Sequence, residues 1–259
     1  MPHPVQYSSV ENKPSLCLFP WAGGRLDVYQ DLIQLLKEDC SIYGIEARGL
    51  YGEAPPHLTL EQMADDYIQE LLPVLSLGSV ILAGASMGGK VAFEMARRLE
   101  KGPLPSPLVV MFDSRIMPLD KKLGLITRVR LHQSILDSAS LGGILQYAIQ
   151  KTRTRLRRRI YSYFIKRGHP LPPSINKLGT ITYLVSKAYR PQPYGGRVIL
   201  FRAGKLEPGT PPDPFNGWGK ACTGGLEIKP IEASHTSILE EPAVSLLAAE
   251  MRFLISEIS

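Results

Sequence analysis

The sequence predicts an α/β fold in which a mostly parallel, doubly wound sheet carries helices on both faces. Short apolar runs alternate along the chain with amphipathic stretches of helical period. Most of these runs are continuously apolar, which is typical of strands buried on both faces. At 259 residues, 44% of them apolar and 21% charged, the chain is long enough to bury the core of one large domain.

Six strands and four helices are expected outside a long insertion in the second half of the chain. The strands cover residues 15–19, 41–45, 80–83, 108–112, 197–201 and 226–231. The helices cover residues 28–36, 59–75, 90–99 and 244–255. Thr59 with Gln62 forms a capping-box pattern at the start of the second helix. We expect residues 1–14 to be a leader or linker and residues 15–259 to form a single domain.

A long insertion separates the strand at 108–112 from the strand at 197–201. It has no strand-like run, and its helical runs cover residues 123–136, 144–152 and 156–165. Open α/β sheets bind ligands outside the carboxyl ends of their strands, and this insertion follows such an end. We therefore expect residues from about 115 to 190 to form a helical lid over the substrate site. A surface decoration unrelated to chemistry is the alternative.

The net charge of +6 comes from one segment. Residues 151–167 carry eight basic side chains and no acidic one, whereas the remaining residues carry 22 basic and 24 acidic side chains. So local an excess argues against a general nucleic-acid-binding surface. No apolar run approaches the ~20 residues of a membrane span. The three cysteines are far apart in sequence and show no metal-ligand spacing, so no metal site is expected: Cys17, Cys40 and Cys222. The N-terminus is too polar for a signal peptide, which favours reduced thiols and a cytoplasmic location.

The segment Gly84-Ala85-Ser86-Met87-Gly88 lies between a predicted strand and a predicted helix. In that context the pattern G-x-S-x-G is the nucleophile elbow typical of the α/β-hydrolase fold. The small residues let strand and helix approach, and the sharp turn lifts the serine hydroxyl clear of the sheet. We predict Ser86 as the nucleophile and the Met87 N–H, at a helix N-terminus, as an oxyanion donor. The alternative is a glycine-rich turn that contains a serine by chance.

A serine nucleophile needs a base, and the base needs an orienting acid. His235 alone among five histidines lies in a short loop between the last strand and the last helix, where this fold supplies its base. Asp113 follows the strand at 108–112, so its carboxylate should reach the same edge of the sheet. We predict Asp113 as the acid. Asp213, in a proline-rich loop nearer His235, is the alternative, although no acid directly follows the strand that ends at Phe201.

A second oxyanion donor is expected from the turn after the first core strand, by analogy with other α/β-hydrolases. This turn is Pro20-Trp21-Ala22-Gly23-Gly24. Pro20 has no N–H, so Trp21 and Ala22 are the candidates, and we choose Ala22. The alternative is a tight turn whose glycines serve packing alone.

Five sequence blocks occur in order: Phe19-Pro20-Trp21-Ala22-Gly23-Gly24, Tyr43-Gly44-Ile45-Glu46-Ala47-Arg48-Gly49-Leu50, Gly84-Ala85-Ser86-Met87-Gly88-Gly89, Ala92-Phe93-Glu94-Met95-Ala96, and His235 followed by Ile238-Leu239. Each block alone is a weak signal, but the five in order are specific. In these blocks the chain resembles the thioesterase domains of nonribosomal peptide and polyketide synthases. The similarity runs from about residue 15 to the C-terminus and is weakest across the insertion.

The resemblance implies cleavage of a thioester carried on the phosphopantetheine arm of an acyl or peptidyl carrier protein, with no cofactor of the enzyme's own. Ser86 would take the acyl group, which then passes to water or to an internal amine or hydroxyl that closes a ring. Carrier proteins are acidic, so the basic run at 151–167 is a candidate docking surface, with a solvated helix face as the alternative. We expect upstream synthase modules or a carrier as partners, and neither nucleic acid nor a membrane span.

Two types of enzyme in this family remain open. An acid placed soon after the elbow, as Asp113 is, and a large insertion resemble the chain-releasing (type I) domains. The starting Met1 and the absence of a carrier domain favour a free-standing type II editing enzyme, although an excised domain would look the same. A carboxylester hydrolase with the same three residues is a further alternative. A non-catalytic binding module would not need Ser86, Asp113 and His235 together.

Overall fold

The computed structural model describes residues 3–116, 159–160, 163, 167, 177–206 and 213–259. The chain divides into two compact units, one of Met1–Ile116 with Asn176–Ser259 and one of Met117–Ile175. In the second unit the four described residues are helical. The helical runs expected at 123–136, 144–152 and 156–165 lie largely outside the described residues. The range expected for the lid also includes residues 178–188, which form a helix of the first unit.

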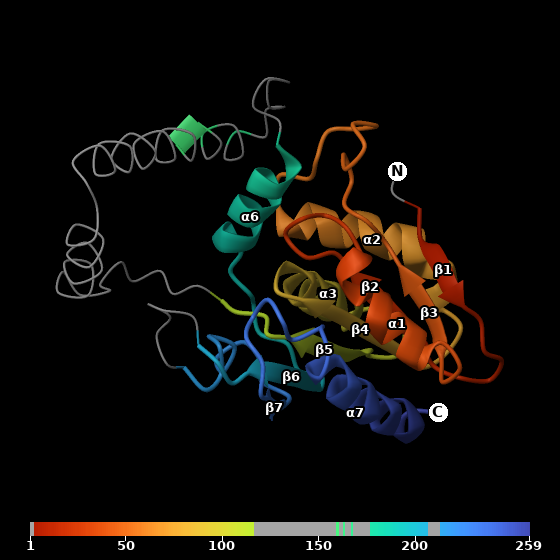
Figure 1. Ribbon diagram of the computed structural model, residues 1–259. Helices are drawn as coiled ribbons and strands as arrows, with labels where there is room; N and C mark the ends of the chain where they lie inside the picture. Colours follow the sequence, from red (N-terminus) through yellow and green to blue (C-terminus); the bar gives the residue numbers. More distant parts are fainter. Residues whose placement is uncertain (1–2, 117–158, 161–162, 164–166, 168–176, 207–212) are drawn as a thin grey trace, which may run out of the picture. The chain divides into compact units, whose positions relative to one another are not determined.

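The first unit is built on one seven-stranded sheet (Figure 1). Its strand order is β1-β3-β2-β4-β5-β6-β7, and every neighbouring pair is parallel except β1 with β3. This confirms the mostly parallel sheet of the α/β-hydrolase fold. The strands are β1 (Val5–Ser8), β2 (Ser15–Phe19), β3 (Ser41–Gly44), β4 (Val80–Ala85), β5 (Leu108–Phe112), β6 (Val198–Ala203) and β7 (Leu226–Ile231).

The central strands end together at one edge of the sheet. Phe19 of β2 is in register with Gly84 of β4, and Ala85 of β4 with Phe112 of β5. Every residue of these three strands is buried, which explains why their sequences are continuously apolar. Loops that leave this edge are therefore brought close together, although they are far apart in sequence.

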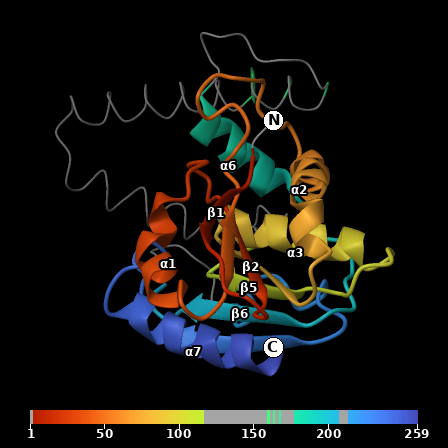
Figure 2. The same ribbon diagram turned by 90° about the vertical axis from the view of Figure 1, so that its right-hand side faces the viewer.

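Helices cover both faces of the sheet. They are η1 (Asp27–Tyr29), α1 (Gln30–Leu36), α2 (Leu60–Leu75), α3 (Met87–Leu99), α6 (Leu178–Ala188) and α7 (Ala243–Glu257). Figure 2 shows α1 with α7 on one side of the sheet and α2 with α3 on the other. α6 packs against α3. The expected cap of α2 is present, because the Gln62 N–H donates to Thr59 Oγ1 at 3.1 Å.

The strand β1 was not predicted, since residues 1–14 were expected to be a leader or linker. It pairs antiparallel with β3 at the edge of the sheet. Three of its four residues are exposed, so burial leaves no apolar pattern in the sequence. Val5 and Tyr7 stay about half exposed. Long-range pairing with β3, rather than a local propensity, makes this strand.

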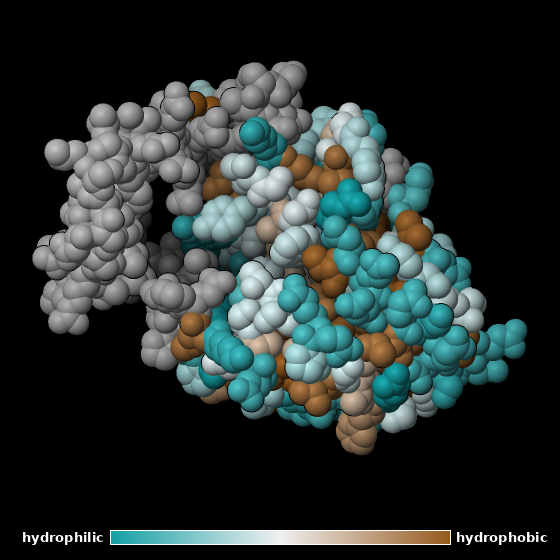
Figure 3. Space-filling view, viewed as in Figure 1, coloured by the Kyte–Doolittle hydropathy of each residue, from teal (hydrophilic) through white to brown (hydrophobic). Residues whose placement is uncertain are grey.

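The surface of the described residues mixes polar and apolar side chains. On the face in Figure 3, brown apolar residues are interspersed with teal polar ones. Large apolar side chains that reach solvent include Trp21, Tyr51, Leu246 and Phe253. Among the described residues, no helix is both long enough and apolar enough to cross a membrane.

Candidate active site

Ser86 lies at the elbow between β4 and α3, and it is the only residue between the two elements. Its backbone angles are φ 52° and ψ −107°, a strained combination for a residue with a side chain. Two glycines make the turn possible. A Cβ on Gly84 would lie 2.3 Å from the carbonyl carbon of Gly88, and a Cβ on Gly88 would lie 2.4 Å from the Phe19 oxygen.

Hydrogen bonds from the next strand hold the elbow in this conformation. The Ser86 N–H donates to the Phe112 carbonyl at 3.0 Å, and Ser114 Oγ donates to the Ser86 carbonyl at 2.6 Å. Ser114 is fully buried. The strain at Ser86 is thus offset by contacts with the end of β5, which keep the half-buried serine at the carboxyl edge of the sheet.

The two predicted oxyanion donors follow neighbouring parallel strands, Ala22 after β2 and Met87 after β4. Met87 is the first residue of α3, where backbone N–H groups have no partner within the helix. Ala22 lies in the turn after β2, which the Gly24 N–H closes on the Trp21 carbonyl at 2.9 Å. Thr182 of α6 hydrogen-bonds the Ala22 carbonyl through its hydroxyl.

Tyr29 ties these two strand ends together, a role that the sequence did not indicate. Its hydroxyl donates to the Phe19 carbonyl at 2.7 Å and accepts the Ala85 N–H at 2.7 Å. Burial raises the pKa of Tyr29 well above its ordinary value, so the hydroxyl stays protonated and can make both bonds. The elbow and the Ala22 turn are therefore connected by a buried side chain.

Asp113 directly follows β5 and has no exposed side-chain surface. Its Oδ1 accepts the Ala203 N–H at 3.1 Å and the Asn216 Nδ2–H at 3.0 Å, and its Oδ2 accepts from His235 Nδ1 at 2.8 Å. Arg115 lies 3.4 Å from both oxygens. Burial opposes ionisation, but the His235 hydrogen bond and the Arg115 charge outweigh it and hold the pKa of Asp113 below its usual range.

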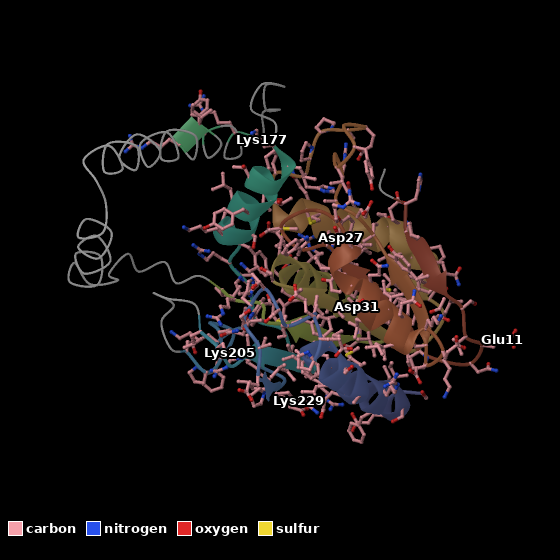
Figure 4. The ribbon with its side chains drawn as sticks, viewed as in Figure 1. Glu11, Asp27, Asp31, Lys177, Lys205 and Lys229 are labelled. Carbon is pink, nitrogen blue, oxygen red and sulfur yellow. The ribbon has the colours of Figure 1, made fainter. Side chains whose placement is uncertain are left out.

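His235 lies in the loop between β7 and α7, as predicted. The ends of β6 and β7 hold this loop, since the Gly204 N–H donates to the Ile231 carbonyl at 2.8 Å and the Lys205 N–H to the Ala233 carbonyl at 3.0 Å. Figure 4 labels Lys205 at this end of the sheet. The His235 side chain is 30% exposed. Its Nδ1 is bonded to Asp113, so Nε2 is the ring nitrogen that the carboxylate does not hold.

The structure joins Asp113 with His235 and gives Asp213 a different environment. The Asp213 carboxylate accepts the backbone N–H groups of Phe215 at 2.9 Å and Gly217 at 2.8 Å. It therefore closes its own turn. Of the two acids that the sequence left open, Asp113 is the one in contact with the predicted base.

A buried lysine in α3 is a second feature that the sequence did not single out. Lys90 Nζ donates to the Ser186 carbonyl in the last turn of α6 at 2.8 Å. Burial, helped by the nearby Arg190 charge, lowers the pKa of Lys90 to about 8. Tyr189 adds a 2.9 Å hydrogen bond to Glu94. The helix that begins with the elbow is thus fastened to the helix that contacts the Ala22 turn.

The thioesterase domain model matches residues 14–249, which is nearly the whole chain. The chain belongs to the thioesterase domain family. It is therefore a hydrolase of the class that acts on thioesters.

Malpibaldin synthetase of Mortierella alpina is 23% identical over 91% of this chain. The dimodular nonribosomal peptide synthase of Bacillus subtilis is 24% identical over 97% of it. The chain spans only 4% and 11% of the lengths of these relatives.

Solved thioesterases share the fold. The Vlm2 thioesterase domain, determined with a bound dodecadepsipeptide, superimposes with a TM-score of 0.63 at 19% identity and covers 97% of both chains. The type II thioesterase BorB of the borrelidin biosynthetic cluster gives a TM-score of 0.64 at 19% identity and covers 96% of both. A thioesterase domain and a type II thioesterase therefore both share this fold. The resemblance inferred from the five sequence blocks is confirmed.

Proposed function

We propose that this thioesterase releases an acyl, peptidyl or polyketide chain from a phosphopantetheine-bearing carrier protein through an acyl-Ser86 intermediate. The observation that supports it best is the 2.8 Å hydrogen bond between Asp113 and His235, at the sheet edge where the elbow presents Ser86. A buried carboxylate that orients a partly exposed imidazole, at the sheet edge that also carries a strained serine, fits an acyl-transfer enzyme.

In the first half-reaction, Ser86 Oγ attacks the thioester carbonyl carbon while His235 Nε2 takes the hydroxyl proton. The oxyanion that forms accepts hydrogen bonds from the N–H groups of Met87 and Ala22. Collapse breaks the carbon–sulfur bond, and His235 returns the proton to the departing thiolate. Asp113 stays ionised throughout and stabilises the imidazolium, consistent with its lowered pKa.

In the second half-reaction, His235 removes a proton from water or from an amine or hydroxyl of the acyl chain. The new nucleophile attacks the Ser86 ester, the ester bond breaks, and the proton passes to Ser86 Oγ. Water gives a free acid, and an internal nucleophile gives a ring.

The proposed partner is a carrier protein, either free or within an upstream synthase module. This rests on the relatives, which are synthases many times longer than this chain. Asp113 directly after β5 favours a chain-releasing enzyme. Editing of misprimed carriers is the second candidate, because the type II enzyme BorB has the same fold over 96% of both chains.

The test follows thiol release from acyl thioesters of a carrier protein, with the wild type and Ser86→Ala, while intact-protein mass spectrometry detects acyl adducts. We expect release by the wild type, an acyl adduct on it, and loss of both in Ser86→Ala. The control is Ser245→Ala, which removes the hydroxyl of an exposed serine in α7. Release that persists in Ser86→Ala would refute the mechanism.

The choice of acyl group separates the candidates. A chain-releasing enzyme should cleave long peptidyl or polyketide thioesters faster than acetyl ones, and an editing enzyme should show the reverse order. Cleavage of simple esters without any thioester activity would instead indicate a carboxylester hydrolase. The product mass distinguishes hydrolysis from ring closure, because hydrolysis adds one water to the released chain.

A further inference from the structure

Residues 213–218, between β6 and β7, form a turn that is built around Asp213, the candidate acid that does not contact His235. Its two oxygens accept the N–H groups of Phe215 and Gly217, and the Asn216 N–H donates to the Asp213 carbonyl at 3.2 Å. Asn216 is thereby held at φ 48°, in the left-handed region that asparagine tolerates better than most residues. The turn orients the Asn216 side chain inward, where it is buried.

The loop is joined to the segment that carries the acid. The Ile116 N–H donates to the Asn216 carbonyl at 2.9 Å, and Trp218 Nε1 donates to the Ser114 carbonyl at 3.0 Å. Gly217 allows this approach, since a Cβ there would lie 2.7 Å from the Ile116 oxygen. The contacts place the loop against residues 114–116, which immediately follow Asp113.

The buried Trp218 extends this connection to the elbow helix. Its ring lies 4.7 Å, centroid to centroid, from that of Phe93 in α3. Both rings are fully buried. Strain or movement in the loop is therefore resisted from two sides, by the chain after β5 and by the helix that follows Ser86.

Asn216 Nδ2 lies 3.0 Å from Asp113 Oδ1, the oxygen that does not receive the His235 hydrogen bond. Oδ1 also accepts the Ala203 N–H. These two neutral donors hold Oδ1 at shorter distances than Arg115, which lies 3.4 Å from both oxygens, and so oppose rotation of the carboxylate about its Cβ–Cγ bond. Oδ2 is then directed at His235. Among the residues that the structure describes, the charged or titratable groups in contact with the carboxylate are Arg115 and His235.

We propose that Asn216, which lies in the turn that Asp213 closes, is a positioning residue for catalysis. Its side-chain amide keeps the Asp113 carboxylate oriented toward His235. The inference rests on the proposed function, because it assigns Asn216 an effect on the Asp113–His235 pair. It gives Asp213 a defined role as well. Asp213 shapes the turn, and the side-chain amide of Asn216 within that turn holds the Asp113 carboxylate.

The experiment uses the full chain with two substitutions. Asn216→Gly removes the amide while tolerating the positive φ, and Asn216→Asp keeps the side-chain size but replaces a donor with a negative charge. Matched controls are Asn12→Gly and Asn12→Asp, because Asn12 is exposed and has a similar φ of 56°. Readouts are kcat and KM for an acyl-pantetheine thioester across pH, and the downfield proton resonance of the His235 Nδ1–H.

We expect kcat to fall about tenfold in Asn216→Gly, as for loss of a hydrogen bond to a charged group. KM should stay within about twofold, since Asn216 supports Asp113 rather than binding substrate. Asn216→Asp should lose more activity, and the acid limb of its pH profile should move to higher pH because the added charge favours the protonated imidazole. The resonance should shift or broaden in both variants, and the Asn12 variants should match the wild type.

Labelling of Ser86 by a fluorophosphonate distinguishes a failure of the proposed function from a failure of the positioning role of Asn216. A wild type that is not labelled and releases no thiol refutes the proposed function, while the proton resonance still tests the inference. A labelled enzyme whose kcat, pH profile and resonance are unchanged in both Asn216 variants overturns the inference alone. Thermal unfolding confirms that each variant is folded, and where Asn216→Gly unfolds, the near-isosteric Asn216→Asp carries the test.

Discussion

Two aspartate–histidine pairs in the described residues have the same nitrogen–oxygen distance of 2.8 Å but opposite patterns of burial. In Asp113–His235 the carboxylate is 0% exposed and the imidazole 30%. In Asp66–His57 the carboxylate is 32% exposed and the imidazole 4%. The distance between the two groups therefore does not by itself distinguish the pairs, whereas burial and position in the fold do.

The difference lies in the second nitrogen of each imidazole. A general base must reach a substrate with the nitrogen that is not bonded to the acid. His57 Nδ1 is buried and has no hydrogen-bond partner in the described part of the chain. The His57 ring packs edge-on against Tyr67 at 5.9 Å, while Arg48 shares Asp66 at 3.1 Å. This pair fixes α2 to the preceding loop, whereas His235 is partly exposed and is the base in the proposed function.

The largest expected effect separates the two histidines by activity. His235→Ala should lower kcat for thioester cleavage by about 10⁶-fold, because it removes the proposed base. His57→Ala should leave the activity of the folded enzyme within about threefold. Steady-state thiol release by both variants, corrected for the folded fraction by circular dichroism, measures this. Equal losses in the two variants would contradict the assignment.

The two acids provide the next effect. Asp113→Asn should lower kcat about 10⁴-fold, since the amide favours the wrong tautomer of His235. Asp66→Asn, with a matched change of shape and charge, should alter kcat little. Asp213→Asn is an informative third variant, with a decrease far smaller than that of Asp113→Asn. If Asp213→Asn were instead the more damaging substitution, the alternative acid would have to be reconsidered.

Stability should show the opposite ranking for the Asp66–His57 pair. His57→Phe keeps a ring against Tyr67 but removes the bond to Asp66, so the free energy of unfolding should fall by about 1 kcal/mol. Urea denaturation followed by fluorescence measures the change. The comparison variant is His235→Phe, in which a partly exposed imidazole is lost and a smaller change is expected. A stabilised His57→Phe protein would argue against a structural role for the pair.

The smallest expected effect is a pH dependence of stability that His57 contributes. Burial lowers the pKa of His57, although the hydrogen bond to Asp66 partly opposes this. An unfolded histidine titrates near about 6.5, so below that pH the unfolded chain binds a proton that the folded chain excludes. The free energy of unfolding therefore falls as the pH drops below about 6.5. In urea denaturation between pH 6.5 and 5.5, the free energy of unfolding of His57→Phe should fall less with decreasing pH than that of the wild type. The same decline in both proteins would contradict the contribution of His57.

Local sequence signals predicted the framework well. Short runs rich in apolar residues, most of them continuous, predicted six of the seven strands, and the capping pattern at Thr59 predicted the start of α2. The glycines around Ser86 predicted the elbow, because their spacing is a direct requirement of a tight strand-to-helix turn. These features depend on residues within a few positions of one another, which is why composition and spacing reveal them. The three proposed triad residues remain predictions for activity measurements to test.

Tertiary structure decided what local signals left open. Which acid meets His235 depends on the ends of β5, β6 and β7 lying side by side, and Asp113 and His235 are 122 positions apart in sequence. The same holds for Asn216, 103 positions from Asp113, and for the buried Lys90, which resembles a surface lysine until α6 packs over it. Periodicity and turn chemistry are local properties, whereas burial and partner choice arise only when distant strand ends meet.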